Sequence, residues 1–217
     1  MTLPFANRAE AGRLLGRRLL AESLTGPLVV MALPRGGVPV AAEVARCLGA
    51  PLDLLIVRKI GAPWQRELAV AAVVDGIPPD IVVNEEISAA VGADATYIER
   101  EAAVQRCEIE RQRKTYLEGR TPLVLAGKTV ILVDDGIATG TTVRAALKAL
   151  HRRSATKVLL AIPVAPHEEV LALRGSREHV VCLAEPQPFH AVGAHYLDFD
   201  QVDDSEVMAA FGSEQQE

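Results

Sequence analysis

Two adjacent carboxylates, Asp134 and Asp135, stand between an apolar run over residues 129–133 and a loop rich in glycine and threonine over residues 136–142. The run has the length and the β-branched content of a buried strand. The loop can turn tightly at its glycines and offers backbone N–H groups and threonine hydroxyls as donors. Because consecutive strand residues point to opposite faces, the two carboxylates can have different roles. One can accept hydrogen bonds from a sugar diol, while the other orients the loop or holds a metal-bound water.

The loop over residues 136–142 is typical of a phosphate site. A helix is predicted over residues 140–152, and the free N–H groups of a helix N-terminus bind anions with help from the helix dipole. The loop is not a Walker A sequence, which needs a lysine that is absent here, nor a GxGxxG dinucleotide loop. Helix capping at a solvated strand end is the alternative interpretation, which the attached glycine-threonine loop disfavours.

A second candidate loop follows the apolar run over residues 28–33. Arg35 offers a bidentate fork for phosphate oxygens, and Gly36 and Gly37 free the backbone for close approach to a ligand. A Gly-Gly turn that leads into a helix is also a common structural feature. This loop on its own therefore leaves a binding role and a structural role open.

A third candidate loop follows the strand predicted over residues 52–57. Arg58 and Lys59 are either a solvated strand end or contacts for a pyrophosphate. Together, the three loops offer two anion-binding regions with a carboxylate pair between them. A ligand that carries a monophosphate, a diol sugar and a pyrophosphate matches this layout, and phosphoribosyl pyrophosphate is such a molecule.

The elements that position these loops form a recurring pattern of apolar runs followed by helical stretches. Strands that are apolar throughout are covered on both faces, so the order predicts a doubly wound α/β fold with a mainly parallel sheet flanked by helices. In such sheets the ligand binds beyond the carboxyl ends of the strands, where the strand order reverses. The strands are predicted over residues 28–33, 52–57, 129–133, 158–164 and 180–183, and the helices over residues 37–48, 140–152, 166–175 and 204–211.

The chain is expected to form a single domain over residues 1–217, with an insertion or lid region over residues 62–127. The insertion contains a predicted hairpin, over residues 69–74 and 81–83, and a long charged helix over residues 95–119. That helix is expected to face solvent or another subunit, and closure of the insertion over a ligand is the functional alternative. Trp64 is expected either to anchor this region through hydrophobic contacts or to lie on the same mobile loop. A small C-terminal hood is predicted over residues 185–211, and a flexible tail over residues 212–217.

Composition and charge indicate which partners the protein can bind and in which cellular compartment it is expected. The formal net charge of −5 argues against nucleic acid as a partner, because there is no basic excess to neutralise phosphates. Cys47, Cys107 and Cys182 form no paired motif, so they are expected to be inert core residues in a reducing cytoplasm. Residues 1–20 predict an amphipathic helix rather than a signal peptide or a membrane span, so no membrane partner is expected.

The stretch VILVDDGIATGTTV, residues 130–143, resembles the phosphoribosyl-pyrophosphate signature of type I phosphoribosyltransferases. The likeness continues through LPRGGVPVA, DLLIVRKIGAP and FHAVGAHYLDFDQVDDSEV, and it spans essentially the whole chain. The sequence looks like a bacterial stand-alone branch of phosphoribosyltransferase-like proteins, some of which are fused to hydrolase domains. The resemblance implies a cytoplasmic transferase of nucleotide metabolism that forms a homo-oligomer, a dimer. It would move the 5-phosphoribosyl group from phosphoribosyl pyrophosphate to a nucleobase or another small nitrogen acceptor, with Mg²⁺ as cofactor.

The resemblance also implies roles for individual residues. Asp134 and Asp135 would bind the ribose hydroxyls, with Mg²⁺ carried by the substrate and reached by one of the two carboxylates through water. Arg35 and Lys59 would be catalytic, because they would stabilise the charge that accumulates on the departing pyrophosphate. Arg35 and Gly36 would form a pyrophosphate loop, in which such enzymes often hold a non-proline cis peptide. The remaining substrate-binding residues would be Gly36, Gly37, Arg58, Gly136, Ile137, Ala138, Thr139, Gly140, Thr141 and Thr142.

The acceptor side is less specific. Purine-salvage members carry a third aspartate in the signature loop where this chain has Ala138, so the sequence disfavours a 6-oxopurine acceptor. In the hood, Phe189 or Tyr196 would stack on the acceptor, and His195 would be a hydrogen-bond partner or a base. A hood that only closes one end of the sheet is the alternative.

Two other classes of function remain open at this level. A non-catalytic sensor could bind the same ligand, although Arg35 and Lys59 favour chemistry because a sensor need not handle a leaving group. A phosphorelay receiver is also an α/β protein with clustered aspartates. It would need an acidic pair after the first strand, where this chain has Pro34 followed by Arg35.

Overall fold

The computed structural model describes residues 3–66, 68–76, 78–121, 123–153, 157–176 and 178–212. The chain divides into two compact units. Unit 1 comprises residues 1–54, 122–140 and 153–217, and unit 2 comprises residues 55–121 and 141–152. The expected single domain, its insertion and its hood stay predictions. The tail predicted from residue 212 onward lies, apart from Gly212, outside the described residues.

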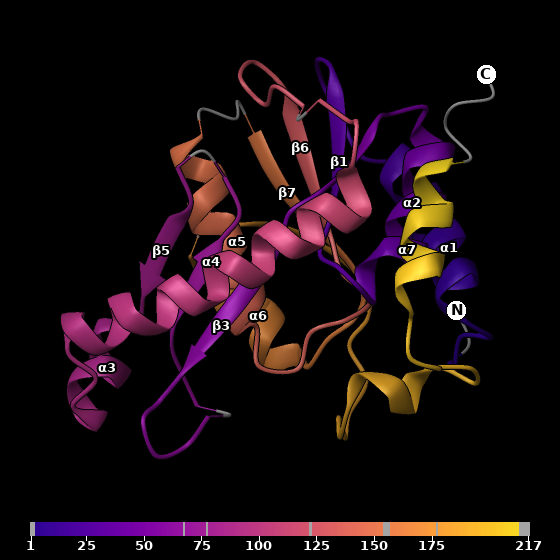
Figure 1. The fold of residues 1–217 in the computed structure, drawn as a ribbon. Helices are drawn as coiled ribbons and strands as arrows, with labels where there is room; N and C mark the ends of the chain where they lie inside the picture. The colour runs from indigo at the N-terminus through magenta and orange to yellow at the C-terminus, as the bar shows by residue number, and fades with distance from the viewer. Residues whose placement is uncertain are drawn as a thin grey trace. The chain divides into compact units, whose positions relative to one another are not determined.

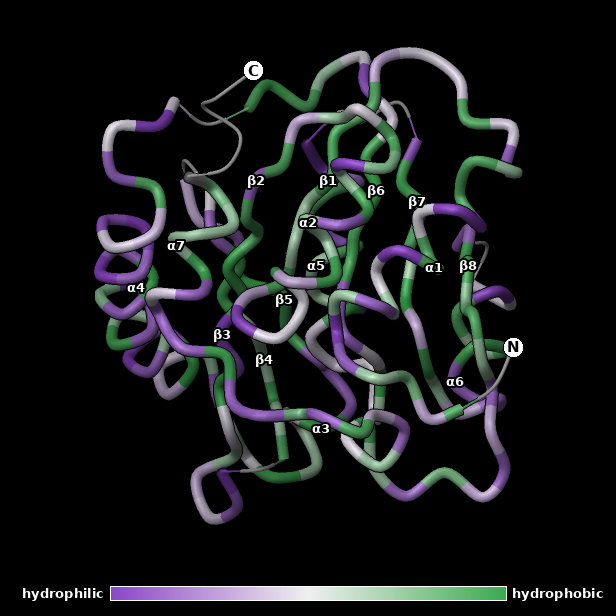
Figure 2. Tube along the Cα trace, turned by 90° about the vertical axis from the view of Figure 1, so that its right-hand side faces the viewer, coloured by the Kyte–Doolittle hydropathy of each residue, from purple (hydrophilic) through white to green (hydrophobic). Residues whose placement is uncertain are grey.

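Unit 1 is built on a five-stranded sheet in the order β2-β1-β6-β7-β8, and all its neighbouring strands are parallel. Figure 2 shows its strands as mostly hydrophobic segments lying side by side. This mainly parallel sheet flanked by helices confirms the predicted fold class. The strands are β1 (Leu28–Ala32), β2 (Leu52–Leu54), β6 (Thr129–Val133), β7 (Lys157–Val164) and β8 (His179–Ala184).

The helices of unit 1 include the expected N-terminal helix, and α1, α2 and α7 lie beside one another in Figure 1. Helix α1 packs closely on α2 because two of its residues at the contact are glycines, which have no side chain. The space between the helices is too small for a Cβ at either position. A Cβ at Gly12 would lie 2.5 Å from the carbonyl oxygen of Val40, and one at Gly16 would lie 2.7 Å from the Cβ of Cys47. The helices are α1 (Arg8–Leu20), α2 (Gly37–Leu48), α6 (His167–Gly175) and α7 (Asp204–Gly212), with a 3-10 turn η1 (Val192–His195).

Unit 2 contains an antiparallel sheet in the order β3-β4-β5, formed by β3 (Val57–Gly61), β4 (Ala69–Val74) and β5 (Asp80–Val83). Every residue of β4 is buried, so this strand is covered on both faces. Helices α4 (Ala95–Leu117) and α5 (Thr141–Arg152) both pack against β3 and β4. Asp75, buried after β4, accepts hydrogen bonds of 2.7 and 3.0 Å from Arg113 of α4, which ties the helix to the end of the strand.

The structure corrects several expectations. The strand predicted over residues 52–57 is wrong, because β2 ends at Leu54 and Val57 begins β3 in the other sheet. Residues 54–57 are all apolar, so hydrophobicity alone could not locate the change of sheet. A short helix, α3 (Glu85–Val91), is present where none was predicted, capped by the Asn84 side chain. Cys107 is exposed, so it is not a core residue. Trp64 is 93% exposed, so it is not a hydrophobic anchor.

The other predicted elements are confirmed to within a few residues, except that the N-terminal helix, predicted over residues 1–20, begins only at Arg8. They include the hairpin, whose strands β4 and β5 pair antiparallel with Val74 opposite Asp80. The long charged helix is also present, as α4. Among the described residues, no helix has both the length and the apolar character that a membrane span requires.

Candidate functional site

The strand order of the unit 1 sheet reverses between β1 and β6. From β1 the chain continues to β2 on one side, while β6 is followed by β7 and β8 on the other. The two strands pair in register up to Ala32 and Val133, and the N–H of Leu33 donates to the carbonyl of Val133 over 2.9 Å. The loops that follow them therefore leave the sheet side by side. Such a switch point is where open α/β sheets bind their ligands.

The loop after β1 leads directly into α2. The peptide bond between Pro34 and Arg35 is cis, as the family resemblance implied. The N–H of Gly37 donates to the carbonyl of Leu33 over 3.0 Å, and that of Val38 donates to the carbonyl of Arg35 over 3.1 Å. These bonds close a tight turn that holds residues 34–36 at the strand end.

Gly36 and Gly37 let this turn lie directly against the acidic pair. A Cβ on Gly36 would lie 2.2 Å from Oδ2 of Asp135, and one on Gly37 would lie 3.0 Å from the Cα of Asp134. Both glycines were predicted to admit a ligand to the backbone. In the structure, the groups that they admit are the two aspartates of the neighbouring loop.

Asp135 forms an ion pair that the sequence did not indicate. Nε of Arg8 lies 2.8 Å from Oδ2 of Asp135, and the two side chains are only 12% and 15% exposed. The same guanidinium donates to the carbonyl of Asp200 over 2.8 Å and lies 3.8 Å from the ring centroid of Phe199. Arg8 is the first residue of α1, far from Asp135 in sequence, and no local pattern distinguishes it from the other arginines of that helix.

Asp134 has a different environment, as the alternation of strand residues predicted. Its Oδ1 accepts a hydrogen bond of 2.9 Å from the N–H of Asp135, which orients the start of the loop. Burial, and then the charge of Asp135, raise the pKa of Asp134 well above its ordinary value. Burial also raises the pKa of Asp135, against the opposing effect of the Arg8 guanidinium. Both carboxylates are thus desolvated, and the one paired with arginine is the more easily ionised.

The predicted hood contacts the acidic pair through Tyr196. Its hydroxyl donates to the carbonyl of Asp135 over 2.5 Å, and its ring is buried between Phe5, at 5.4 Å between centroids, and Phe199, at 5.0 Å. Burial, and then the charge of Asp135, raise the pKa of this phenol. The ring faces are occupied by protein, so Tyr196 contributes to the site through its hydroxyl.

Phe189 and His195, the other two predicted hood residues, lie together with ring centroids 5.0 Å apart. Nε2 of His195 is buried and has no hydrogen-bond partner among the described residues. Burial, and then the nearby His190, lower the pKa of His195, so its neutral form is favoured. A role for these residues toward an acceptor stays a prediction.

The loop after β6 is anchored at Ile137. This side chain is 2% exposed, and its N–H donates to the carbonyl of Val164 over 3.0 Å. Ala138 and Thr139 are exposed, and Gly140 has a φ of 65°, a left-handed conformation that favours glycine. Thr141 and Thr142 begin α5. The loop is therefore tied down at its base and open at its tip.

The three predicted cations lie in different surroundings. Arg35 is partly exposed and lies 3.6 Å from a carboxylate oxygen of Asp204, in the first turn of α7. Arg58 and Lys59 lie inside β3 of unit 2 rather than in a loop. Nε of Arg58 donates to Gln105 over 3.2 Å, whereas Lys59 is exposed.

A parallel sheet with an acidic pair and a cis-peptide turn at its switch point defines a type I phosphoribosyltransferase-like domain. The family model described as Phosphoribosyl transferase domain matches residues 8–195, and the chain belongs to this family. The predicted family is therefore confirmed.

Known relatives agree with this assignment. Proteins of Mycobacterium tuberculosis strains CDC 1551 and H37Rv, each named "Putative phosphoribosyl transferase", are 43% identical over 206 residues. The match covers 94% of this chain and 46% of theirs, so the chain spans about half the length of these curated relatives. The crystal structure of TT1426 from Thermus thermophilus is 44% identical, with a TM-score of 0.80 over 96% of this chain and 97% of that one. A Neisseria gonorrhoeae protein with bound ppGpp shares the fold at 13% identity and a TM-score of 0.50, over 95% of this chain and 92% of that one.

Proposed function

We propose that this domain transfers the 5-phosphoribosyl group of phosphoribosyl pyrophosphate to a nucleobase or another small nitrogen acceptor and releases pyrophosphate. The observation that carries the proposal is the acidic pair, Asp134 and Asp135, held against the turn at residues 34–37 where the strand order reverses. The family membership of the chain supports it. The proposed setting is the nucleotide metabolism of the cytoplasm.

In this proposal, the two ends of the donor are bound by different loops. The carboxylates of Asp134 and Asp135 accept hydrogen bonds from the ribose hydroxyls. The 5-phosphate receives hydrogen bonds from backbone N–H groups and threonine hydroxyls of residues 136–142, together with the helix N-terminus that follows. The anchored base of this loop, at Ile137, would limit the ordering that a ligand must impose.

The reaction breaks the bond between the anomeric carbon and the pyrophosphate oxygen, and a bond from the acceptor nitrogen to that carbon replaces it. Glycosyl transfer of this kind passes through an oxocarbenium-like state. Arg35 and Lys59 would stabilise the charge that develops on the departing pyrophosphate, with Arg58 and the N–H groups of Gly36 and Gly37 as further contacts. Exclusion of water would prevent hydrolysis of the donor.

Magnesium is part of the proposal. Mg²⁺ prefers hard oxygen ligands and keeps several of its waters, and the carboxylate oxygens of Asp134 and Asp135 fit such water-mediated contact. When bound with the donor, the ion would neutralise charge on the pyrophosphate. The raised pKa of Asp134 would return toward its ordinary value beside a cation, because the ionised form would then be favoured.

Residue 138 is an alanine rather than an acid, which disfavours a 6-oxopurine as the acceptor. Under this proposal, the segment with Phe189, His195 and Tyr196 covers the acceptor. The unpartnered Nε2 of His195 is the group that would hydrogen-bond to it.

Calorimetric titration of phosphoribosyl pyrophosphate with Mg²⁺ into the wild-type protein and an Asp134→Asn/Asp135→Asn variant tests the site. We expect saturable binding in the wild type and its loss in the variant. No binding by the wild type, or equal binding by both proteins, would overturn the proposal. A panel of nitrogen acceptors then tests catalysis, with pyrophosphate release as the readout. Binding without release across the panel would favour the alternative, a phosphoribosyl-pyrophosphate-binding regulator.

A further inference from the structure

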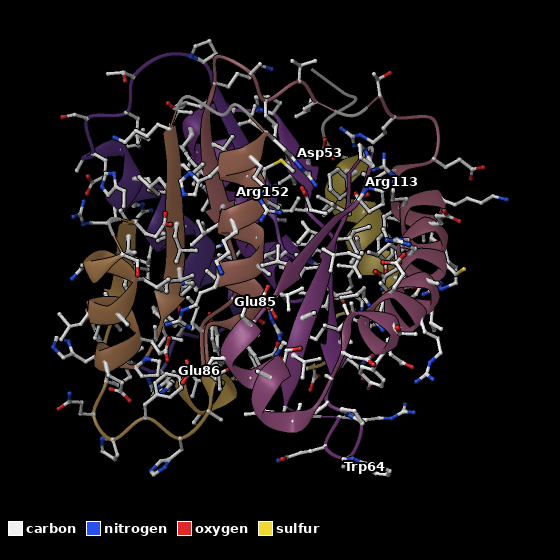
Figure 3. All side chains as sticks on the ribbon, turned by 90° about the vertical axis from the view of Figure 1, so that its left-hand side faces the viewer. Asp53, Trp64, Glu85, Glu86, Arg113 and Arg152 are labelled. Carbon is white, nitrogen blue, oxygen red and sulfur yellow. The ribbon has the colours of Figure 1, made fainter. Side chains whose placement is uncertain are left out.

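A cavity of about 410 Å³ lies within unit 2, and its lining residues belong to that unit. Its walls come from the end of β3, the turn that joins β3 to β4, and the first half of α4. Trp64 lies on that turn and extends outward from it (Figure 3). Pockets that bind small molecules have volumes of roughly 300–1,000 Å³, so this cavity is large enough for one.

The walls of the cavity are held by specific contacts. A Cβ on Gly61 would lie 2.3 Å from the carbonyl oxygen of Arg66, so the turn folds back against the end of β3. The N–H of Ala62 donates to the carbonyl of Leu68 over 2.8 Å and closes the turn. The hydroxyl of Tyr97 donates to the carbonyl of Gly61 over 2.8 Å and fixes α4 to the same point. The cavity is therefore part of the folded unit.

The cavity carries an excess of positive charge. Among the residues that the structure describes, three cations line it, Lys59, Arg66 and Arg100, and one carboxylate, Glu101, which leaves an excess of two positive charges among them. The chain as a whole has a formal charge of −5. Arg100 already binds Glu101, at 3.2 Å, whereas Lys59 and Arg66 have no ion pair among the residues that the structure describes. Arginines that line a cavity with an excess of positive charge favour a phosphate group, because each guanidinium has five N–H donors and an arginine that pairs with one carboxylate keeps donors for a second anion.

An aromatic residue accompanies these cations. The side chain of Trp64 is 93% exposed, so the faces of its indole ring are available. A single exposed apolar residue is common on protein surfaces, but this one lines a cationic cavity. Indole rings stack on planar bases, and guanidinium groups bind phosphate oxygens.

From this combination we propose that unit 2 binds a nucleoside monophosphate. Its phosphate contacts Arg66 and Arg100, and its base stacks on Trp64. The proposal does not depend on the transfer reaction. Lys59 also lines the cavity, but the proposed function assigns it to pyrophosphate, so the test uses the two arginines instead.

Trp64 is the single tryptophan of the chain, so its fluorescence reports on the cavity without a label. We expect adenosine monophosphate to change this fluorescence saturably. Adenosine lacks the phosphate that would contact the arginines, and inorganic phosphate lacks the base that would stack on Trp64. Titrated separately, each is expected to bind at least about tenfold more weakly than adenosine monophosphate. Arg66→Gln and Arg100→Gln are each expected to weaken binding of adenosine monophosphate by about tenfold, since each removes hydrogen bonds to a charged group.

Two control variants separate this site from the rest of the molecule. Arg106→Gln removes another α4 arginine, one that pairs with Glu99 at 2.7 Å and does not line the cavity, and it should leave the titration unchanged. Asp135→Asn should abolish binding of phosphoribosyl pyrophosphate and keep the response to adenosine monophosphate. The proposal is overturned if the wild type shows no saturable response, if an Arg66→Gln/Arg100→Gln variant with native circular dichroism responds like the wild type, or if Asp135→Asn loses the response.

Discussion

Arg8 links three parts of unit 1 through one side chain. It neutralises Asp135, donates to the carbonyl of Asp200 and lies over the ring of Phe199. Its planar guanidinium suits these three contacts at once, because it can donate in several directions and still stack. The charge state of the acidic pair therefore depends on a residue outside the signature loop.

We expect Arg8→Gln to lower the free energy of unfolding by about 2 kcal/mol, because it leaves a largely buried carboxylate without its charged donor. Arg8→Lys should recover part of this loss, since it restores the charge without the fork. Urea unfolding measures both effects. Arg13→Gln is the matched control, because Arg13 lies in the same helix in an exposed pair with Glu43 and should cost less than about 1 kcal/mol. If Arg8→Gln and Arg13→Gln lowered the free energy of unfolding equally, the buried pair of Arg8 and Asp135 would stabilise the protein no more than an exposed pair does.

The cysteines are predicted to differ strongly in reactivity. Burial raises the pKa of the Cys182 thiol to about 12, so at pH 8 almost none of it is thiolate, the reactive form. Cys107 is exposed on α4, and Cys47 of α2 lies against Gly16 of α1. We expect one rapidly reacting thiol per native chain with Ellman's reagent. Cys107→Ser should remove the rapid phase, and Cys182→Ser should leave it unchanged. A rapid phase that survives Cys107→Ser would contradict this assignment.

At the scale of elements, the contact between α1 and α2 determines where the N-terminal helix lies. We expect Gly12→Ala to destabilise the protein by about 1–3 kcal/mol, because the added methyl meets the backbone of Val40, which cannot move aside cheaply. The gain in helix propensity, about 1 kcal/mol, only partly offsets this clash. Thermal unfolding measures the net effect.

Gly175→Ala is the control for this substitution. Gly175 is the last residue of α6, and no atom of the described residues, apart from its chain neighbours and the backbone of its own helix, lies within 4 Å of the position that its Cβ would take. The same change of residue should therefore be neutral or slightly stabilising there. A loss of stability as large as that of Gly12→Ala would mean that the close approach of α1 to α2 is not the cause.

At the scale of the whole molecule, the main sheet could be predicted from sequence because its strands are apolar on both faces and are separated by clear helical patterns. The acidic pair and the turn at residues 34–37 could be placed because strand ends of a parallel sheet meet at one edge, whereas the cis peptide within that turn was implied by the family resemblance. The contact between Arg8 and Asp135 could not, since it joins residues 127 apart in sequence and leaves no local pattern. Helix α5 also follows a strand of the main sheet, yet it packs on the sheet of unit 2, a choice that depends on three-dimensional contacts.

The central strand of the small sheet, β4, also has a consequence for the unfolded chain. Its sequence, AVAAVV, is uncharged, apolar and free of proline, which are the properties of segments that form intermolecular cross-β structure. In the native state β3 and β5 occupy both of its edges, and Arg58, Lys59 and Asp80 on these neighbours add charge beside it. Loss of unit 2 structure would expose this strand. Heat-induced aggregation of the protein is therefore expected to begin at residues 69–74, and the native pairing of the small sheet protects the chain against it.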